Sequence, residues 1–392
     1  MGIIYQRRAV SETAPAKTLH PYNPTTLYNI DMKVFVGLSG GVDSSIAALL
    51  LKEQGYDVTG VYMKNWTKSL PGLDNPWKAD FEDAKQVAKQ LGIPFKIYDF
   101  EKDYFDKVVR YMIDGFKAGF TPNPDIMCNQ EIKFKLLLEQ ALEDGADFIA
   151  TGHYANTKGG HLYMAKDLNK DQTYFLYSVD SEALKKTIFP LGELTKPEVR
   201  KIAEKAKLTT ATKKESMGIC FVGKVRIKDF LSQYVKKQPG DIVDQHGKVI
   251  GQHEGAIYYT IGQRHGLDVG GGLPYYVTGK DMDKNEVYVT TDISDKKLWS
   301  KKIKLTNLHW IDPTPNYQPP TTNLHVRTRH RSTLIPVRNL EKAKNGQWFV
   351  ELDTDVLAVT PGQSTVFYSG QECLGGGIVA QMFKFSTPTI LT

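Results

Sequence analysis

The stretch "FVGLSGGVDSS", Phe35 to Ser45, sets the expectation for the first half of the chain. It closes an apolar run and leads into "IAALLLKEQG", an arrangement typical of a strand, a glycine-rich turn and a helix. Such a turn offers backbone N–H groups to an anion, and the helix N-terminus adds a positive field. The lysine that a Walker loop places after its last glycine is missing. We therefore expect a loop that holds pyrophosphate as a leaving group, with ATP split at its α-phosphate.

Strands and helices are predicted to alternate along this part of the chain. Apolar runs bounded by turn residues predict strands at 33–39, 57–63, 95–100 and 146–152. Apolar residues at helical spacing predict helices at 44–55, 80–92, 105–116 and 131–145. This alternation is typical of a parallel, doubly wound sheet with helices on both faces, so the expected fold class is α/β.

The character of the sequence changes near residue 237. Before it, Thr195 and Glu198 have capping-box spacing and predict a helix at 195–207. After it come glycines and short strands, and the sequence beyond about 305 predicts a small antiparallel β-barrel. We expect a disordered leader at 1–31, a nucleotide-binding catalytic α/β domain at 32–226, a small central domain at 227–302 and a C-terminal β-barrel at 303–392.

The leader has little apolar periodicity, and we expect it to be dispensable. Its arginines and hydroxyl residues also suit a weak transit peptide, although no amphipathic Arg-rich helix is evident. The expected location is the cytoplasm, with mitochondria as the alternative if the leader is a transit peptide. No apolar run approaches the roughly 18 residues that span a bilayer, so no membrane partner is expected.

Composition restricts the class of protein. The three cysteines, Cys128, Cys220 and Cys373, form no C-x-x-C pair, which argues against a zinc ribbon, an iron–sulfur cluster and a disulfide scaffold. They fit a reducing compartment. The net charge is +6, and the segment 200–237 carries eleven Lys or Arg against three acids. That segment predicts a surface that follows a phosphate backbone, with a solvated helix face as the alternative.

The side chains of the loop fit nucleotide binding. Ser39, Ser44 and Ser45 add hydroxyl donors, and Asp43 could hold a magnesium ion or orient the loop. A structural Gly–Asp turn is the alternative for a bare G-G-x-D. The full S-G-G-x-D-S-S string after an apolar strand resembles the loop of the ATP pyrophosphatase superfamily, and this resemblance implies adenylation chemistry.

Two cysteines have polar neighbours. In "TPNPDIMCNQEIKF", Cys128 stands at an expected helix start, where the helix dipole favours a thiolate, and Asp125 suits acid–base chemistry. A lone Cys is more often a buried hydrophobe, but the polar flanks argue against burial here. Cys220 lies in a basic segment, which favours a thiolate if the lysines fold close. Two such cysteines beside an adenylating loop predict sulfur transfer, whereas Cys373 is taken as structural.

Three further strings suggest contacts with RNA. His153 in "GHYA" follows a strand, at the edge where doubly wound sheets bind ligands, although a packed or solvated His is commoner. "NKDQTYFLY", which contains Lys170 to Gln172, is either an exposed turn or a polar patch for RNA. "RTRHR" predicts a strand with one basic face, made by Arg327, Arg329 and Arg331. A solvated basic strand is the alternative, but together with the basic segment it favours a tRNA-binding barrel.

Together these motifs resemble one family, the tRNA-specific 2-thiouridylases of bacteria and organelles. The shared strings, in family order, are "GLSGGVDSS", "VYMKNW", "TPNPDIMCNQEIKF", "TGHYA", "KDQTYFL", "LGELTKPEVRKIA", "GICFVG", "YYTIGQRHGL" and "TPGQSTVFY". They cover nearly the whole chain from Lys33 to about Phe383. The strings that carry cysteine separate this family from other ATP pyrophosphatases.

The resemblance implies an enzyme that uses ATP and Mg²⁺ to make 2-thiouridine at the wobble position of the tRNAs for Lys, Glu and Gln. It implies adenylation of the uracil C2 oxygen and sulfur transfer from a persulfide on Cys220. Cys128 is implied as the second catalytic cysteine and Asp125 as the general acid or base. The implied partners are tRNA and a sulfur donor from a cysteine desulfurase relay, and the chain is expected to be a monomer.

The resemblance also implies the binding residues. ATP would contact Gly37, Leu38, Ser39, Gly40, Gly41, Val42, Asp43 and Ser44, with Met63 and Gly152 at its adenine–ribose end. The target base would face Asn123, Pro124 and Asp125. The tRNA would contact His153, Lys170, Asp171, Gln172, Arg329, His330 and Gln363. No protein metal site is implied beyond the magnesium that accompanies ATP.

The chain departs from the family pattern at three places. Members usually have Arg-Tyr-Arg-Gln where this chain has Arg329 to Ser332, although His330 can still stack on a base. Met217 replaces a threonine, which removes a hydroxyl near the expected persulfide. The leader has no counterpart in the family's usual start.

Two other classes of protein stay open. An amidotransferase-type synthetase uses a similar loop but needs an ammonia source, and no catalytic Cys follows Met1, because residue 2 is Gly. A non-enzymatic RNA-binding protein would need neither Cys128 nor Cys220. Mass spectrometry of tRNA incubated with ATP, sulfide and the protein would separate these classes.

Overall fold

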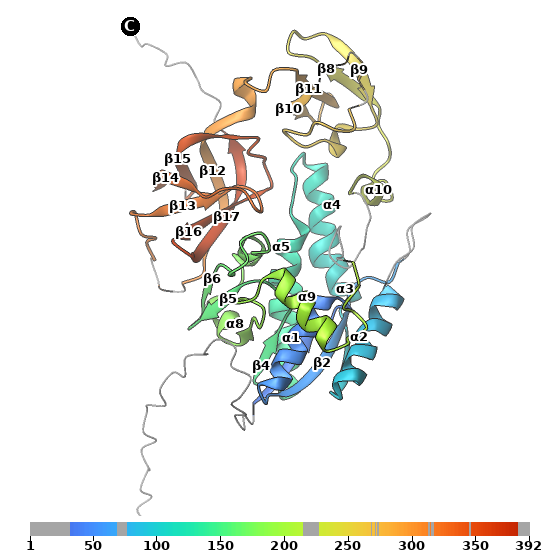
Figure 1. Cartoon of the computed structure of the whole chain (residues 1–392). Helices are drawn as coiled ribbons and strands as arrows, with labels where there is room; N and C mark the ends of the chain where they lie inside the picture. Colours follow the sequence, from blue (N-terminus) through green and yellow to red (C-terminus); the bar gives the residue numbers. More distant parts are fainter. Residues whose placement is uncertain are drawn as a thin grey trace, which may run out of the picture.

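The computed structural model describes residues 32–382, apart from 69–76, 215–226 and the single positions 268, 271, 273, 313, 315, 316 and 345. The predictions for the leader, for Met217 and for Cys220 lie outside the described residues. Figure 1 shows a sheet flanked by helices at the bottom, a β-barrel at the upper left and a small β-rich unit at the upper right. In the described part of the chain, no helix is long and apolar enough to cross a membrane.

The first unit is built on a five-stranded sheet in which all strands are parallel, in the order β3-β2-β1-β4-β7. The strands are β1 Lys33–Gly37, β2 Asp57–Lys64, β3 Phe95–Asp99, β4 Phe148–Ala150 and β7 Thr187–Ile188. The strand order reverses between β1 and β4, and ligands bind at the carboxyl edge beside such a reversal. The predicted doubly wound α/β class is confirmed.

Helices cover both faces of this sheet. One face carries α1 Val42–Glu53, α2 Trp77–Leu91 and α9 Lys196–Lys205. The other carries α3 Glu101–Tyr104, η1 Phe105–Val109, α4 Arg110–Lys117, α5 Pro124–Cys128, η2 Asn129–Leu136 and α6 Leu137–Glu143. Two short helices, α7 Thr173–Leu176 and α8 Ser181–Lys185, precede β7. Side chains alternate along β1, so Val34 and Val36 pack beneath α1 while Phe35 packs on the opposite face.

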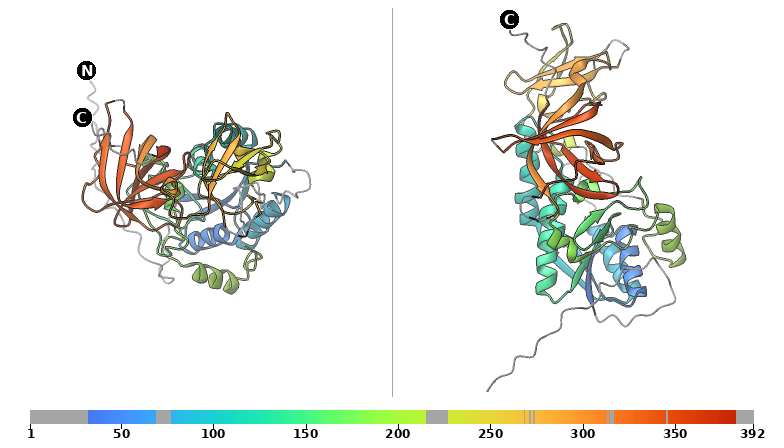
Figure 2. Two further views of the ribbon diagram at one scale, coloured as in Figure 1. Left: turned by 90° about the horizontal axis from the view of Figure 1, so that it is seen from above. Right: turned by 90° about the vertical axis from the view of Figure 1, so that its left-hand side faces the viewer.

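The second unit is a small sheet with its own core. After α10 Ile227–Leu231, its strands lie in the order β10-β11-β8-β9. The elements are β8 Gly240–Val243, β9 Val249–His253, η3 Ala256–Tyr258, β10 Tyr276–Asp281, β11 Glu286–Thr290 and η4 Lys296–Leu298. The helical stretch α3–η1–α4 rises from the first unit towards this one, and α4 contacts η3 (Figure 2).

The third unit is a closed antiparallel barrel. Its strands lie in the order β12-β15-β14-β13-β16-β17, and β17 pairs back onto β12. They are β12 Trp299–Trp310, β13 Leu324–Arg327, β14 Ile335–Lys342, β15 Trp348–Leu357, β16 Ser364–Ser369 and β17 Glu372–Met382. Closure pairs the strand edges that an open sheet would expose. The predicted C-terminal β-barrel is confirmed.

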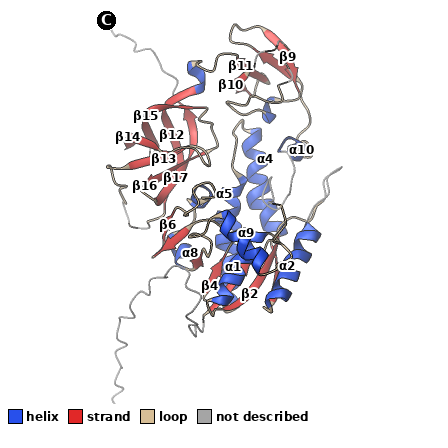
Figure 3. Ribbon diagram, in the orientation of Figure 1, coloured by secondary structure: helices blue, strands red, loops and turns tan. Residues whose placement is uncertain are grey.

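A hairpin from the first unit extends the barrel sheet. It consists of β5 Asn156–Lys158 and β6 His161–Tyr163, and β6 pairs with β17 where Leu162 faces Cys373. Figure 3 shows β6 directly below β16 and β17. Sequence analysis missed this hairpin, because strands of three residues carry too little alternation to predict. The barrel is therefore joined to the first unit by backbone hydrogen bonds.

Two predicted boundaries are wrong and one cap is confirmed. The helix predicted from 131 begins at Pro124, because Asn123 caps it by accepting from the N–H of Asp125 at 3.1 Å. The basic strand predicted across "RTRHR" ends at Arg327, and Arg331 has a φ of 63°, so the arginines do not share one strand face. The capping box that opens α9 is present as predicted.

Candidate active site

The phosphate loop joins β1 to α1, and its own hydroxyls hold its backbone. Ser44 Oγ accepts a hydrogen bond from the N–H of Ser39 at 3.1 Å. The hydroxyls of Ser44 and Ser45 both donate to the carbonyl of Gly41, at 3.1 and 2.8 Å. These bonds fix a tight turn at the carboxyl edge of the sheet, and the N-terminus of α1 points from it towards the expected phosphates.

Glycines let neighbouring segments approach this loop closely. A Cβ at Gly152, just after β4, would lie 2.6 Å from the backbone nitrogen of Ser44. A Cβ at Gly40, where φ is 72°, would lie 2.2 Å from a carbonyl oxygen in the first turn of α2. At Gly37 the nearest atom to such a Cβ is the terminal methyl of Met63, at 3.4 Å. The predicted ATP residues on β1, α1, β2 and the β4 loop are therefore neighbours in space.

Asp43 in this loop is held by two residues that sequence analysis did not identify. Lys196 Nζ lies 2.7 and 2.8 Å from the two carboxylate oxygens of Asp43. The hydroxyl of Tyr154 donates to Asp43 Oδ1 at 2.9 Å. Lys196 opens α9, and its side chain is 11% exposed against 32% for Asp43. The carboxylate is thus enclosed on the α9 side while staying reachable from solvent.

The donors around Asp43 fit a magnesium ion. Carboxylate oxygens and hydroxyls are the hard ligands that Mg²⁺ prefers, and one or two carboxylates with substrate phosphates usually suffice. Among the residues that the structure describes, no group of three or more His, Cys, Asp or Glu side chains could hold a metal ion. This loop therefore suits a magnesium ion that takes its remaining ligands from the phosphates of the nucleotide.

The predicted target-base residues start a long helix on the other face of the sheet. α5, η2 and α6 follow one another without a break, and α6 ends shortly before β4 begins. The start of α5 therefore lies towards the carboxyl edge of the sheet, as the phosphate loop does. Asn123 caps the helix, Pro124 is buried, and Asp125 is partly exposed.

Cys128 lies in the apolar core, contrary to the expectation from its polar neighbours. Its side chain is fully buried together with Ile132 and Met112. The expectation was wrong because its neighbour Asn129 is itself only 2% exposed and donates to the carbonyl of Phe175 at 2.9 Å. A polar side chain can be buried when it is bonded, so polar flanks do not indicate exposure.

Two buried amides have atoms without a hydrogen-bond partner in the described structure. Asn65 follows β2, two residues after Met63, and is 2% exposed, yet both its Nδ2 and its Oδ1 lack a partner. The Oδ1 of Asn129 also lacks one. Leaving such a group unpaired costs about 1–3 kcal/mol. A base edge carries both donors and acceptors, so these amides suit a nucleotide ligand. Both lie in strings shared with the family, but no local pattern predicted that they would be buried with unpaired atoms.

His153, a predicted tRNA contact, is an interior residue in this structure. Its side chain is 8% exposed, with Nδ1 2.7 Å from Thr151 Oγ1 and Nε2 3.3 Å from Lys133 Nζ. Burial, together with the charge of Lys133, holds the pKa of His153 well below its usual value, so the ring is neutral at pH 7. Contact with tRNA would require the ring to be uncovered first.

Asp171, also predicted to touch tRNA, joins two units of the protein instead. Its carboxylate is fully buried, and Oδ2 accepts from Arg327 at 2.7 Å and from Thr173 at 2.8 Å. Oδ1 accepts from the N–H of Ala165 at 3.1 Å. The exposed polar patch expected here is therefore wrong for Asp171. The neighbouring Gln172 also bonds within the protein, its Oε1 accepting from the N–H of Tyr154.

The three units meet at Thr121, just before the expected target-base residues. Its N–H donates to the carbonyl of Pro361 at 2.9 Å, and its carbonyl accepts from Gln363 Nε2 at 2.7 Å. Its Oγ1 lies 3.2 Å from that of Thr260 in the second unit. A pocket of about 330 Å³ opens here, lined by Thr260, Ile261, Gly262, Gln263, Arg329, Thr360 and Gln363. Two predicted tRNA contacts, Arg329 and Gln363, thus line a pocket between the second unit and the barrel, and Gln363 also bonds to Thr121 of the first unit.

His330 lies on aromatic side chains of the first unit. Its ring centroid is 4.4 Å from that of Phe175. Burial lowers the pKa of His330 to about 4, and the charges of Arg331, Arg327 and Lys170 act in the same direction. The ring is therefore neutral at pH 7, and it packs against Phe175 and Tyr174 in tilted geometry. Lys170, a further predicted tRNA contact, lies near it.

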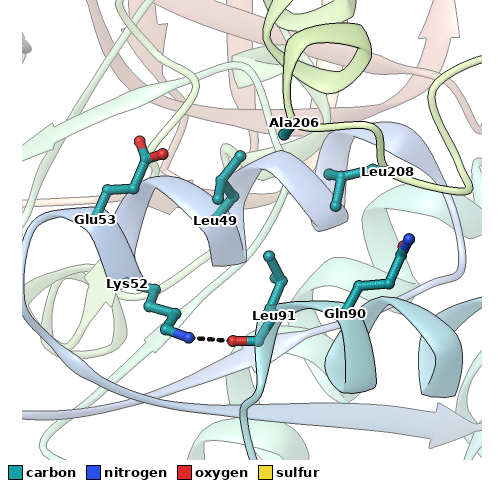
Figure 4. Close-up of a pocket in the computed structure, with 7 residues that line it drawn as sticks. All are labelled: Leu49, Lys52, Glu53, Gln90, Leu91, Ala206 and Leu208. Atoms are coloured by element: carbon teal, nitrogen blue, oxygen red, sulfur yellow. Dashed lines mark hydrogen bonds between the residues drawn. The ribbon is translucent and has the colours of Figure 1, made fainter.

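A second pocket lies away from this chemistry. Figure 4 shows it between the C-terminal end of α1, the end of α2 and the segment after α9, with Lys52 donating to the carbonyl of Leu91. It measures about 370 Å³ and is lined by Leu49, Lys52, Glu53, Gln90, Leu91, Ala206 and Leu208. It is remote from the phosphate loop, which lies at the other end of α1, and it holds none of the predicted site residues.

The basic segment at 200–237 is partly neutralised within the protein. Lys213 Nζ lies 2.7 Å from Asp80 of α2, close to the phosphate loop. Lys228 and Lys237 each lie 2.8 Å from Glu254, and together they lower the pKa of that carboxyl to about 2. Fewer charges than the count of eleven are therefore available to an RNA backbone.

Three family models match the chain in succession. They are described as a tRNA methyl transferase HUP domain at residues 32–224, a tRNA methyl transferase PRC-barrel domain at 228–291 and an aminomethyltransferase beta-barrel domain at 300–379. The three matches coincide with the sheet-and-helix unit, the small β-rich unit and the closed barrel.

Curated relatives match over nearly the same length. A protein of Bacillus subtilis (strain 168) named tRNA-specific 2-thiouridylase MnmA is 49% identical over 363 residues, which cover 91% of this chain and 97% of that protein. A protein of the same name from Lacticaseibacillus paracasei is 47% identical and covers 90% of this chain and 95% of that one. A solved 4-thiouridine synthetase–RNA complex with bound ATP is 18% identical, covers 52% of this chain and 50% of that one, and has a TM-score of 0.32, too low to bear on activity. The identity and coverage of the two relatives show that the chain belongs to the family of tRNA-specific 2-thiouridylases, which are tRNA sulfurtransferases.

Proposed function

We propose that the enzyme catalyses ATP-dependent 2-thiolation of the wobble uridine in the tRNAs for Lys, Glu and Gln. The observation that carries this proposal is the phosphate loop. It lacks a Walker lysine, and it lies on the same edge of the sheet as the helix start that precedes Cys128. Such a loop favours release of pyrophosphate, and a thiol in the helix that starts at the same edge suits sulfur transfer to the activated base.

The first step is adenylation of the base. ATP lies along residues 37–44, with Met63 and Gly152 at its adenine–ribose end. Asp43 would hold a Mg²⁺ ion, which would neutralise the phosphate charge. The uracil C2 oxygen attacks the α-phosphorus, the bond from that phosphorus to the bridging oxygen breaks, and pyrophosphate leaves. Asp125 accepts the N3 proton as the C2 carbonyl becomes adenylated. Asn123 and Pro124 hold the base against this carboxylate.

The second step is sulfur transfer. The terminal sulfur of a Cys220 persulfide attacks C2, and AMP leaves with the former C2 oxygen. Cys128 then attacks the Cys220 sulfur and breaks the S–S bond, which leaves the thiocarbonyl on the base and a Cys128–Cys220 disulfide. Asp125 returns the proton to N3. A cysteine desulfurase relay supplies the persulfide sulfur, and a thiol reductant restores the two thiols.

The burial of Cys128 adds a requirement to this mechanism. Because its side chain is fully buried, sulfur transfer requires the start of α5 to leave its core contacts. We propose that tRNA drives this movement by engaging Lys170, Arg329, His330 and Gln363, because Gln363 bonds directly to Thr121 just ahead of the helix. A monomer in the cytoplasm is the form in which we expect the enzyme to act.

Nucleoside mass spectrometry tests the reaction. Enzyme, ATP, Mg²⁺, a persulfide donor and unmodified tRNA for Lys, Glu or Gln should give sulfur in place of oxygen at the wobble uridine. Cys220→Ser should retain slow, tRNA-dependent pyrophosphate release and make no 2-thiouridine, since a hydroxyl cannot carry a persulfide. Cys128→Ser should accept labelled sulfur on Cys220 and fail to release it to the base. Thiolation by Cys220→Ser, or no gain of sulfur on the tRNA with the wild-type enzyme, would overturn the proposal.

A further inference from the structure

The loop that lacks a Walker lysine receives a lysine from another part of the fold. Lys196 is separated from Asp43 by 153 positions in sequence, yet its Nζ contacts both carboxylate oxygens of Asp43. The ring of Tyr154 lies 5.8 Å from the same Nζ, and its hydroxyl bonds the same carboxylate. The ammonium group is therefore aimed at the N-terminus of α1, where the phosphates are expected.

The position is unfavourable for a lysine that only links two helices. Asp43 is the second residue of α1 and Lys196 the first residue of α9, so the ammonium lies near the positive ends of two helix dipoles. A cation near a helix N-terminus is destabilising, whereas an anion there is stabilising. A cation at this place is favourable only when an anion accompanies it. Asp43 is that anion here, and a phosphate chain would be a stronger one.

We propose that Lys196 is a phosphate-binding residue of this site and that it replaces the missing Walker lysine. Asp43 holds the ammonium group in the nucleotide-free enzyme. When ATP and Mg²⁺ bind, Asp43 turns to the metal and Lys196 turns to the phosphate oxygens, so that one cation takes the place of another on the same carboxylate. The inference rests on the proposed function, because it takes ATP as the nucleotide.

ATP binding without magnesium is the most direct test. Equilibrium dialysis with labelled ATP in the presence of EDTA measures binding without turnover. Lys196→Met should weaken this binding by about 10- to 100-fold, which corresponds to one lost charge-assisted hydrogen bond. Lys196→Arg keeps the charge and should retain most of the affinity. Asp43→Asn should tighten ATP binding in the absence of magnesium, because the carboxylate no longer competes for Lys196 or repels the phosphates. In this variant, added Mg²⁺ should no longer increase the affinity for ATP.

Controls separate phosphate binding from a merely structural role. Lys166→Met removes an exposed ion pair to the same helix, to Glu198 at 3.4 Å, and should leave ATP affinity unchanged. If Lys196→Met lowers the melting temperature but binds ATP like the wild type, Lys196 only links α9 to α1 and the inference is wrong. Unchanged or weaker binding by Asp43→Asn without Mg²⁺ also overturns it, even if Lys196→Met does not fold. If the wild-type protein binds ATP neither in the presence nor in the absence of Mg²⁺, the proposed function itself is wrong.

Discussion

At the scale of single residues, the buried polar side chains carry most of the information about the site. Asn65 has two buried atoms without a partner in the described structure, whereas the equally buried Asp171 has every carboxylate oxygen bonded. Native proteins leave few buried polar groups unpaired. A fully bonded buried group therefore indicates a structural role, and an unpaired one beside the phosphate loop indicates a ligand.

Replacing Asn65 should separate stability from activity. Asn65→Leu keeps the number of side-chain heavy atoms and removes both unpaired polar atoms, so we expect an unchanged or higher melting temperature. ATP-dependent pyrophosphate release should fall by about tenfold, because the nucleotide or base loses a hydrogen bond worth roughly 1.4 kcal/mol. Calorimetry and a pyrophosphate assay measure the two effects. A large loss of stability with normal turnover would show that Asn65 is a packing residue.

The half-buried His330 should make stability depend on pH. Its pKa is about 4 in the folded protein, against about 6.5 in an unfolded chain. Between these values the unfolded chain binds a proton that the folded protein does not, so stability is present above about pH 6.5 and falls as the pH drops towards 4. His330→Gln should lose less stability over this window than the wild type. Urea unfolding at several pH values measures the difference, and identical pH profiles would contradict the assignment.

At the scale of elements, the approach of the β4 loop to α1 shapes the nucleotide site. The N-terminus of α1 is packed against Gly152 so closely that no Cβ fits, and the nearest atoms belong to backbone rather than to a movable side chain. A backbone cannot give way as a flexible side chain does. The loop after β4 and the phosphate loop are therefore packed backbone against backbone, and a shift of one displaces the other.

Adding one methyl group at Gly152 tests this arrangement. Gly152→Ala would place Cβ 2.6 Å from the nitrogen of Ser44, so α1 must shift at the point where the phosphates bind. We expect ATP affinity to fall by about tenfold or more and the melting temperature to fall with it, since overpacking typically costs about 1–3 kcal/mol. Gly270→Ala is the matched control, because among the described residues no atom lies within 4 Å of a Cβ there. Equal ATP affinity in both variants would contradict the close contact.

At the scale of the whole molecule, the barrel is tied to the nucleotide-binding unit by more than a linker. The hairpin β5–β6 extends the barrel sheet, and the buried pair between Asp171 and Arg327 crosses the same boundary. Thr121 bonds to the barrel through Gln363 and approaches the second unit through Thr260. The barrel and the second unit therefore both contact the segment just ahead of the helix that carries Cys128.

Breaking the buried pair should destabilise the protein strongly. Arg327→Met leaves the carboxylate of Asp171 buried without its cation, and removing one partner of such a pair typically costs about 3–5 kcal/mol. The double variant Asp171→Asn/Arg327→Met removes both charges and should recover part of this loss. Urea unfolding gives the free energies. A loss below about 1 kcal/mol for Arg327→Met, the range of exposed pairs, would show that the pair is not buried in solution.

Local patterns in the sequence were sufficient for much of the fold. The alternation of strands and helices, the phosphate loop and the capping box at Thr195 could be predicted, because each depends on side chains within a few positions of one another. The family resemblance added the expected enzyme class, which the relatives confirm. The start of the Cys128 helix at Pro124 and the three-residue strands of the barrel hairpin were missed because their local signals are weak.

The environment of the site depends on contacts between distant segments. Lys196 reaches Asp43 only because α9 packs beside α1, and Asp171 meets Arg327 only because the barrel docks on the first unit. Cys128 is buried for the same reason, although its neighbours in sequence are polar. Apolar periodicity and helix capping involve residues within one or two turns of one another, so the local sequence is enough to predict them. Burial and charge pairing depend on which surfaces are brought together, and that is decided only when the units pack.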